Sequence, residues 1–123
     1  MGWIRVGATA VCVVAVVAAC GSDDPDVEAA AEASLGASLF ENNCAVCHGA
    51  SGMGTNVGPP LVHDIYEPGH HPDETFQRAV AQGTPAHHWD FGDMPPVPGL
   101  EPDEVGEIIA YVRSLQRDAG IIR

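Results

Sequence analysis

The apolar residues between positions 35 and 123 recur at the three-to-four-residue spacing of amphipathic helices. The clearest pattern predicts a helix that Pro102 opens and that ends near Arg117, with one apolar stripe formed by Val105, Ile108, Ile109, Val112 and Leu115. A second helix is predicted from Pro72 to a stop at Gly83. A first helix, over residues 35–42, carries its apolar face on Leu35, Leu39 and Phe40.

Two long segments separate these helices. Residues 49–71 and 84–100 are rich in Gly, Pro and His and lack the two-residue period of strands. A domain of about 90 residues with loops this long buries only a thin core of its own. The sequence therefore predicts an all-α domain whose centre holds something bulky and apolar.

The first 20 residues follow a different pattern. Arg5 precedes an apolar run from Val6 to Ala19, which is about 14 residues long. A membrane span needs about 20 residues, so this length is typical of a signal-peptide core. The run ends in Ala-Ala-Cys-Gly at residues 18–21, which resembles a bacterial lipoprotein signal sequence. That resemblance implies cleavage before Cys20 and acylation of its thiol and new amino group.

We therefore divide the chain into a signal peptide (1–19), a lipidated Cys20 with a flexible acidic tether (20–34) and a folded domain (35–123). The Ala-rich part of the tether could also extend the first helix. The expected location is the outer face of the bacterial cytoplasmic membrane, where the lipid anchors the protein. An ordinary signal peptide cut nearby and an uncleaved membrane anchor are the alternatives.

The charge of the chain restricts its partners. There are 17 acidic residues against 5 basic ones, all of them Arg, and the net charge is −12. Nucleic acid is a poor partner, because contacts to phosphates need a basic face. A protein with a basic docking face fits better, because opposite charges speed encounter.

Residues 44–48 form a Cys-x-x-Cys-His motif. Cys44 and Cys47 can each form a thioether with one vinyl group of a haem, and the adjacent His48 can ligate the iron. The other two cysteines are accounted for, since Cys12 lies in the signal peptide and Cys20 takes the lipid. One covalent haem c is thus the expected filling of the domain.

Two other uses of a Cys-x-x-Cys pair fit less well. A structural zinc site needs two further ligands at suitable spacing, which the scattered histidines would supply only in an unusual arrangement. A thioredoxin-like redox site needs a βαβ context, and no strand pattern is present.

With this motif, residues 35–123 resemble a bacterial class I cytochrome c. Gly36 and Phe40 match the small and aromatic residues of that family's first helix, and Ile108 and Tyr111 match their partners on its last helix. The resemblance implies a small all-α fold, with three main helices and long loops wrapped around one covalent haem.

The same resemblance implies roles for three further residues. The run Gly-Pro-Pro-Leu at 58–61 is similar to the family's loop below the haem, so the Pro59 carbonyl would accept a hydrogen bond from His48 and Leu61 would cover the haem. Met94, in Gly-Asp-Met-Pro-Pro at 92–96, would be the iron ligand opposite His48. Met53 and another His are the alternatives, but Met53 follows His48 by only five residues.

Other conspicuous residues allow several interpretations. The pairs His70-His71 and His87-His88 could form a copper site, bind a haem propionate or replace an iron ligand. They could equally be loop histidines at a wet surface or against the haem edge. Trp89 could pack on the haem or donate to a propionate.

Iron with both axial positions filled leaves no place for oxygen or peroxide, so we expect an electron carrier and not an enzyme. Its iron would cycle between ferric and ferrous states between membrane-associated or exported redox proteins. The alternative is a haem subunit of a larger dehydrogenase or oxidase. Two other hypotheses are an enzyme or gas sensor in which Met94 is displaced, and a metal-handling protein that uses the histidine pairs.

Overall fold

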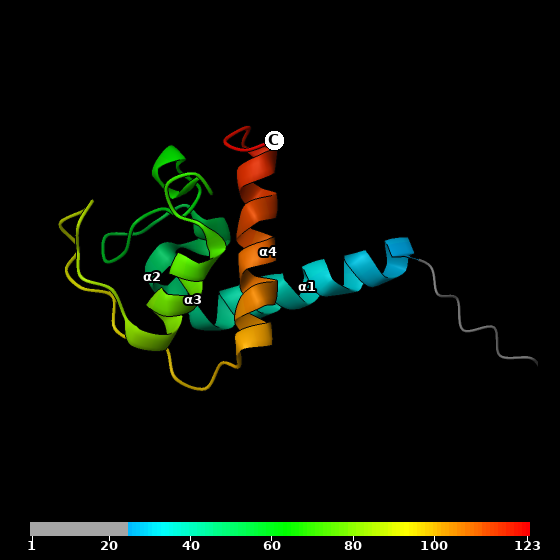
Figure 1. Ribbon diagram of the computed structural model, residues 1–123, viewed down its shortest axis with the longest axis horizontal. Coiled ribbons are helices and arrows are strands. Elements are labelled where there is room, and N and C mark those ends of the chain that lie inside the picture. The colour runs from blue at the N-terminus through cyan, green and yellow to red at the C-terminus, as the bar shows by residue number, and fades with distance from the viewer. Residues whose placement is uncertain (1–24) are drawn as a thin grey trace, which may run out of the picture.

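The computed structural model describes residues 25–123, so the expected signal peptide and Cys20 lie outside the described residues. Four helices and two short 3₁₀ turns make up this part: α1 (Pro25–Asn43), α2 (Ala45–His48), η1 (Ala50–Gly52), η2 (Asp64–Tyr66), α3 (Asp73–Gln82) and α4 (Pro102–Asp118). The only strand-like pairing among the described residues is an isolated bridge between Thr84 and Met94. The predicted all-α class is therefore confirmed. Figure 1 shows α4 crossing the inner end of α1, with α2, α3 and the long loops gathered beside α4.

Helix α1 begins ten residues before the predicted start at Leu35. Pro25 occupies its first position, and Asp26 and Glu28 lie in its first turn, where the helix dipole favours acidic groups. The Ala-rich segment thus extends the helix, an outcome that the sequence had left open. Residues 28–35 are all exposed, and this half of α1 projects away from the body of the domain (Figure 1).

The inner half of α1 packs closely on α4. Gly36 faces the backbone of α4 so tightly that an added Cβ would collide with the Glu107 carbonyl oxygen and lie 3.1 Å from the Cβ of Tyr111. One turn later, Phe40 is fully buried and its ring centroid lies 5.5 Å from that of Tyr111. Together with Ile108, these residues form the helix contact that the family resemblance predicted.

The other side of α4 packs on α3 through a second cluster, formed by Val80, Val105 and Ile109. Four members of the predicted stripe are buried, but Leu115 is only half-buried. Arg113 and Gln116 are buried instead, at 6% and 0% exposure. The stripe therefore continues beyond Val112 with polar side chains.

The ends of α3 and α4 follow local chemistry. Pro72 precedes the first residue of α3 and does not occupy it, and Gly83 ends the helix with φ +75°, which favours glycine. At the start of α4, the Glu104 carboxylate accepts a hydrogen bond of 2.9 Å from the Glu101 N–H, which would otherwise lack a partner. No helix within residues 25–123 combines the length and the apolar character that crossing a membrane requires.

Substitution of Gly36 by Ala should destabilise the protein by about 1–3 kcal/mol, because the new methyl group forces α1 away from the backbone of α4. Unfolding in guanidinium, followed by far-ultraviolet circular dichroism, measures the loss. Gly106 provides the matched control, since it lies within α4 and a Cβ there would meet nothing within 4 Å. Gly106→Ala should be neutral or stabilising by up to about 1 kcal/mol. Equal losses in both variants would contradict the proposed close contact.

Candidate functional site

A largely apolar cavity of about 520 Å³ lies between α2, α3, α4 and the two long loops. Its volume falls within the range of cofactor and ligand pockets, about 300–1,000 Å³. Apolar side chains such as Phe76, Val80, Ile108 and Val112 form much of the wall. The six residues predicted to hold the cofactor also line it: Cys44, Cys47, His48, Pro59, Leu61 and Met94.

The two thiols lie at α2, which follows α1 almost without interruption, with Cys47 inside the helix. Cys44 immediately precedes α2, and its N–H donates to the Phe40 carbonyl at 2.7 Å. Cys44 is half-buried, Cys47 is exposed, and both are free thiols. Burial, and secondarily the neighbouring Cys47, raise the pKa of the Cys44 thiol to about 11. Cys44 thus stays protonated at neutral pH in this setting.

His48 is 8% exposed and held in one orientation. Its Nδ1 lies 2.9 Å from the Pro59 carbonyl oxygen. A carbonyl can only accept, so Nδ1 carries the proton and donates it. Burial lowers the pKa of His48, and the hydrogen bond to Pro59 offsets part of that change. The neutral ring therefore leaves Nε2 with a free lone pair, as a metal ligand requires.

The loop after α2 places Pro59 by folding back onto that helix. Thr55 donates its hydroxyl to the Cys47 carbonyl at 2.6 Å. Gly58 lies so close that an added Cβ would come within 2.5 Å of the same oxygen. The contacts bring the Pro59 carbonyl to the His48 ring.

Met94 is fixed by its backbone on another part of the cavity wall. Its N–H and carbonyl bond to Thr84 at 2.9 and 3.0 Å, just after the end of α3. Gly83 is essential to this approach, because an added Cβ would lie 2.6 Å from the Met94 carbonyl oxygen. Met53, the alternative ligand, is 66% exposed and does not line the cavity.

Trp89, in the loop between α3 and α4, also lines the cavity. Its indole N–H tests whether the cavity lining suits a haem. Its indole Nε1 is buried and has no hydrogen-bond partner among residues 25–123. The indole lies near Tyr66 and offsets part of the rise in the Tyr66 pKa caused by burial, but the geometry is not that of a hydrogen bond. A buried unpaired donor costs about 1–3 kcal/mol. A haem carboxylate is an acceptor of the kind that this donor needs.

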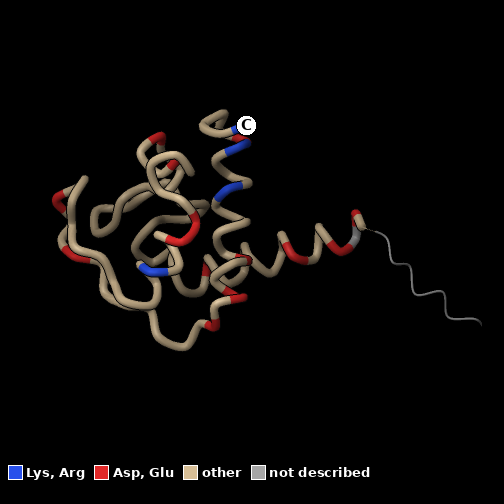
Figure 2. The backbone as a smooth tube through the Cα atoms, viewed as in Figure 1, with Lys and Arg blue, Asp and Glu red and all other residues tan. Residues whose placement is uncertain are grey.

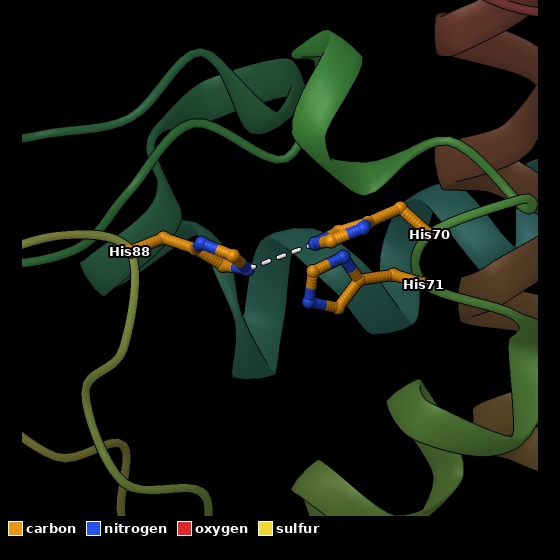
Figure 3. A group of neighbouring side chains, drawn as sticks. All are labelled: His70, His71 and His88. Carbon is orange, nitrogen blue, oxygen red and sulfur yellow. Dashed lines mark hydrogen bonds between the residues drawn. The ribbon is translucent and has the colours of Figure 1, made fainter.

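The two histidine pairs, separate in the sequence, meet at the rim of the cavity. His70 and His88 approach each other with their Nε2 atoms 3.3 Å apart, and the Nε2 atoms of His71 and His87 lie 3.5 Å apart. Figure 3 shows His88 extending from its own loop toward His70 and His71.

Sequence reasoning missed Arg113, a buried residue that organises the loops. Its guanidinium pairs with Asp73 at 2.8 Å and donates to the carbonyls of Tyr66 and His71, each at 2.6 Å. It also donates to the Gln116 side chain at 2.7 Å. Arg113 lies four residues after Ile109 and Gln116 lies four residues after Val112, both of them buried stripe positions. Helical spacing could therefore have indicated that Arg113 and Gln116 are buried.

A family comparison decides the class of this site. The model described as Cytochrome c matches residues 33–116. The chain belongs to the cytochrome c family. The predicted haem c and the predicted electron-transfer function are thereby confirmed, and so is the small class I fold. The free thiols of Cys44 and Cys47 are available for covalent attachment.

Three curated relatives of this cytochrome are subunits of cbb3-type cytochrome c oxidases. The FixP subunit of Sinorhizobium medicae is 38% identical over 92 residues, covering 67% of this chain and 29% of the relative. The FixP subunit of Rhizobium meliloti is 37% identical over 86 residues, with the same coverage. The CcoP subunit of Azospirillum brasilense is 30% identical over 93 residues, covering 67% of this chain and 30% of the relative. The cytochrome therefore spans less than a third of the length of these relatives. No solved structure matched the chain significantly.

Arg113→Met should destabilise the cytochrome by about 2–4 kcal/mol, because the His71 carbonyl and the Asp73 carboxylate lose the guanidinium that pairs with them and the Tyr66 carbonyl keeps only the longer bond from Gln116. Guanidinium unfolding of the haem-loaded protein measures the effect. Arg117→Met, an exposed change on the same helix, should stay within about 0.5 kcal/mol of the parent. Arg113→Lys should recover only part of the loss, because one ammonium cannot replace a planar fork of donors. Full recovery by Lys would mean that charge alone matters.

Proposed function

We propose that Cys44 and Cys47 form the thioethers to the haem and that His48 and Met94 are the axial ligands of its iron. The observation that carries this proposal is the convergence of all four side chains on one cavity, with His48 oriented by Pro59 so that Nε2 is free. When bound, the haem iron supplies a one-electron couple between the ferric and ferrous states. Met with His ligation favours the ferrous state and gives a comparatively high reduction potential.

The surrounding residues maintain this ligand set. Pro59 holds the proton of His48 at Nδ1, so the ring cannot turn without losing a hydrogen bond. The Thr84 bridge restrains the backbone of Met94, and Leu61 contributes apolar cover. Trp89 would donate its unpaired N–H to a haem propionate. A ligand set restrained on both sides suits an electron carrier, because little must move when the iron changes oxidation state.

Exchange of Met94 for Ala should open one axial position. The ferric protein should lose the weak long-wavelength absorption band of Met-ligated haem, and the ferrous protein should bind carbon monoxide rapidly. Met53→Ala should retain the parent spectrum, because Met53 is exposed and lies away from the cavity. Rapid carbon monoxide binding by the parent would instead favour a ligand-binding enzyme or sensor.

The cytochrome also needs a location, and we propose that it is anchored by lipid at Cys20 on the outer face of the bacterial cytoplasmic membrane. Residues 1–19 would be the signal peptide that directs export. The exposed half of α1 then replaces much of the expected flexible tether, so residues 25–34 act as a helical spacer. At about 1.5 Å per residue this spacer is roughly 15 Å long, about half the reach of an extended chain.

The proposed partners are redox proteins with a basic docking face. Acidic side chains occur on α1, η2, α3, α4 and the loops, whereas within residues 25–123 the basic ones lie only on α3, in the last turns of α4 and at the C-terminus (Figure 2). The names of the curated relatives favour a cbb3-type oxidase as the system served. The chain would act there either as a separate carrier or as a haem subunit. Co-purification of the oxidase in mild detergent distinguishes a stable subunit from a transient carrier.

Removal of the acylated thiol tests the anchor. Cys20→Ser should move the haem-loaded cytochrome from the membrane to the soluble fraction, or leave it as an uncleaved precursor of greater mass. Cys12→Ser, a change within the expected signal peptide, should leave the mature protein in the membrane fraction. Fractionation with mass spectrometry of the N-terminus reads both results. A Cys20→Ser protein that is cleaved and still membrane-bound would refute the lipid anchor.

A further inference from the structure

Four imidazole rings gather where two loops meet at the cavity rim. His70 and His71 come from the segment before α3, and His87 and His88 come from the segment after it. The rings are neighbours, with centroids 4.2 Å apart for His87 and His88 and 5.1 Å apart for His71 and His88. One ring nitrogen from each of His70, His71 and His88 lies within 4.8 Å of the other two. The three rings converge on one region in Figure 3.

The hydrogen bonds of this cluster determine which ring nitrogens carry a proton, and they leave the Nε2 atoms of two rings without one. His71 places Nδ1 at 2.6 Å from the Ile65 carbonyl, and His87 places Nδ1 at 2.8 Å from the Pro85 carbonyl. Both Nδ1 atoms must carry the proton, because carbonyls only accept. In the neutral rings, both Nε2 atoms are then acceptors, yet they face each other at 3.5 Å. Two lone pairs at this separation repel each other, and a cation between or beside them would relieve that repulsion.

The arrangement has the features of a metal-binding histidine site. Zinc–nitrogen bonds of about 2.0–2.1 Å in a tetrahedron place two ligand nitrogens about 3.4 Å apart. The Nε2 atoms of His70 and His88 are 3.3 Å apart. A ligating histidine typically donates its other ring N–H to a carbonyl, as His71 does to Ile65. The side chains are also accessible to solvent, so an ion has a path of entry.

We propose that His70, His71 and His88, with His87 beside them, bind one divalent transition-metal ion of the zinc or copper class at the rim of the haem cavity. Imidazole is a preferred ligand of both ions, and copper should bind more tightly than zinc at the same ligands. The chain as a whole carries a net charge of −12, which favours the approach of a dication. The site is separate from the residues assigned to the haem iron.

The pKa values of two histidines of the cluster are lowered. The pKa of His71 is lowered mainly by desolvation, and repulsion from His70, His87 and Arg113 lowers it further. The hydrogen bond to the Ile65 carbonyl offsets part of this change. The pKa of His88 is lowered in the same direction, by desolvation and then by its three histidine neighbours. Neutral imidazoles are the form that a metal binds.

The site would also affect the haem. All four histidines line the same cavity as His48 and Met94, so a bound dication adds positive charge near the cofactor. Positive charge favours the ferrous state, which carries one positive charge less. Metal binding should therefore raise the reduction potential of the cytochrome.

Titration of the full-length, haem-loaded cytochrome with Zn²⁺ tests the proposal. Calorimetry should give one site per chain with a dissociation constant of about 1 μM or lower. His70→Ala and His88→Ala should each weaken binding at least tenfold, and the double variant should abolish it. The matched control is His63→Asn, since His63 is exposed, lies outside the cluster and caps a turn, a role that Asn can fill. This variant should bind Zn²⁺ like the parent.

A second readout separates a metal site from a merely structural cluster. Zn²⁺ should raise the reduction potential of the parent and of His63→Asn, but not that of the double variant. An unchanged optical haem spectrum verifies that each variant is folded, and His88→Gln replaces any Ala variant that fails this check. Absence of Zn²⁺ binding, equal binding by the double variant, or binding only to protein without haem would overturn the proposal. The last result would mean that the histidines serve the haem itself.

Discussion

The contact between α1 and α4 at Gly36 is the constraint on which the haem site depends. Because Gly36 has no side chain, the two helices meet backbone to backbone, and Phe40 is then buried against Ile108 and Tyr111. Helix α2 follows α1 directly, so the same contact determines where the Cys-x-x-Cys-His motif lies. The opposite side of α4 receives α3 through a separate apolar cluster. One helix thereby positions both walls of the cavity.

Polar groups take over where the apolar core ends. The loops that close the cavity have little regular structure, so their carbonyls need partners from elsewhere. Arg113 and Gln116 supply these donors from a buried face of α4. Arg113 donates to the carbonyls of Tyr66 and His71. Gln116 donates to the carbonyls of Leu61 and Tyr66. Side chains that are fully paired can be buried at small net cost. In a domain with a thin core, this network provides the order that further apolar packing would otherwise provide.

The parts of the protein that depend on local pattern were predictable from the sequence. The start and stop signals at Pro72 and Gly83 located α3 to within a residue, and helical spacing after Pro102 located α4 equally well. The motif at 44–48 indicated the cofactor before any geometry was known. Features that depend on contacts between distant segments were not. The burial of Arg113 requires acceptors 40 or more residues away in the sequence. Likewise, periodicity could identify the two histidine pairs but could not show that two loops of irregular structure bring them within hydrogen-bond distance. The start of α1 was left open because its first half has no apolar face, so only the helix propensity of Ala and Glu indicated it.

The continuity of α1 has a consequence for rotation as well as for distance. A helix turns by about 100° for each residue, so its two ends have a definite angular relation. Because α1 runs from Pro25 to Asn43 and leads directly into α2, the direction in which the haem edge faces is coupled to the azimuth of the chain at Pro25. Adding one residue to the exposed half would lengthen it by only about 1.5 Å but would swing the redox face through more than a quarter of a circle. The number of residues in this spacer thus determines the orientation of the haem edge relative to the chain at Pro25. An irregular segment of the same composition would not maintain that orientation.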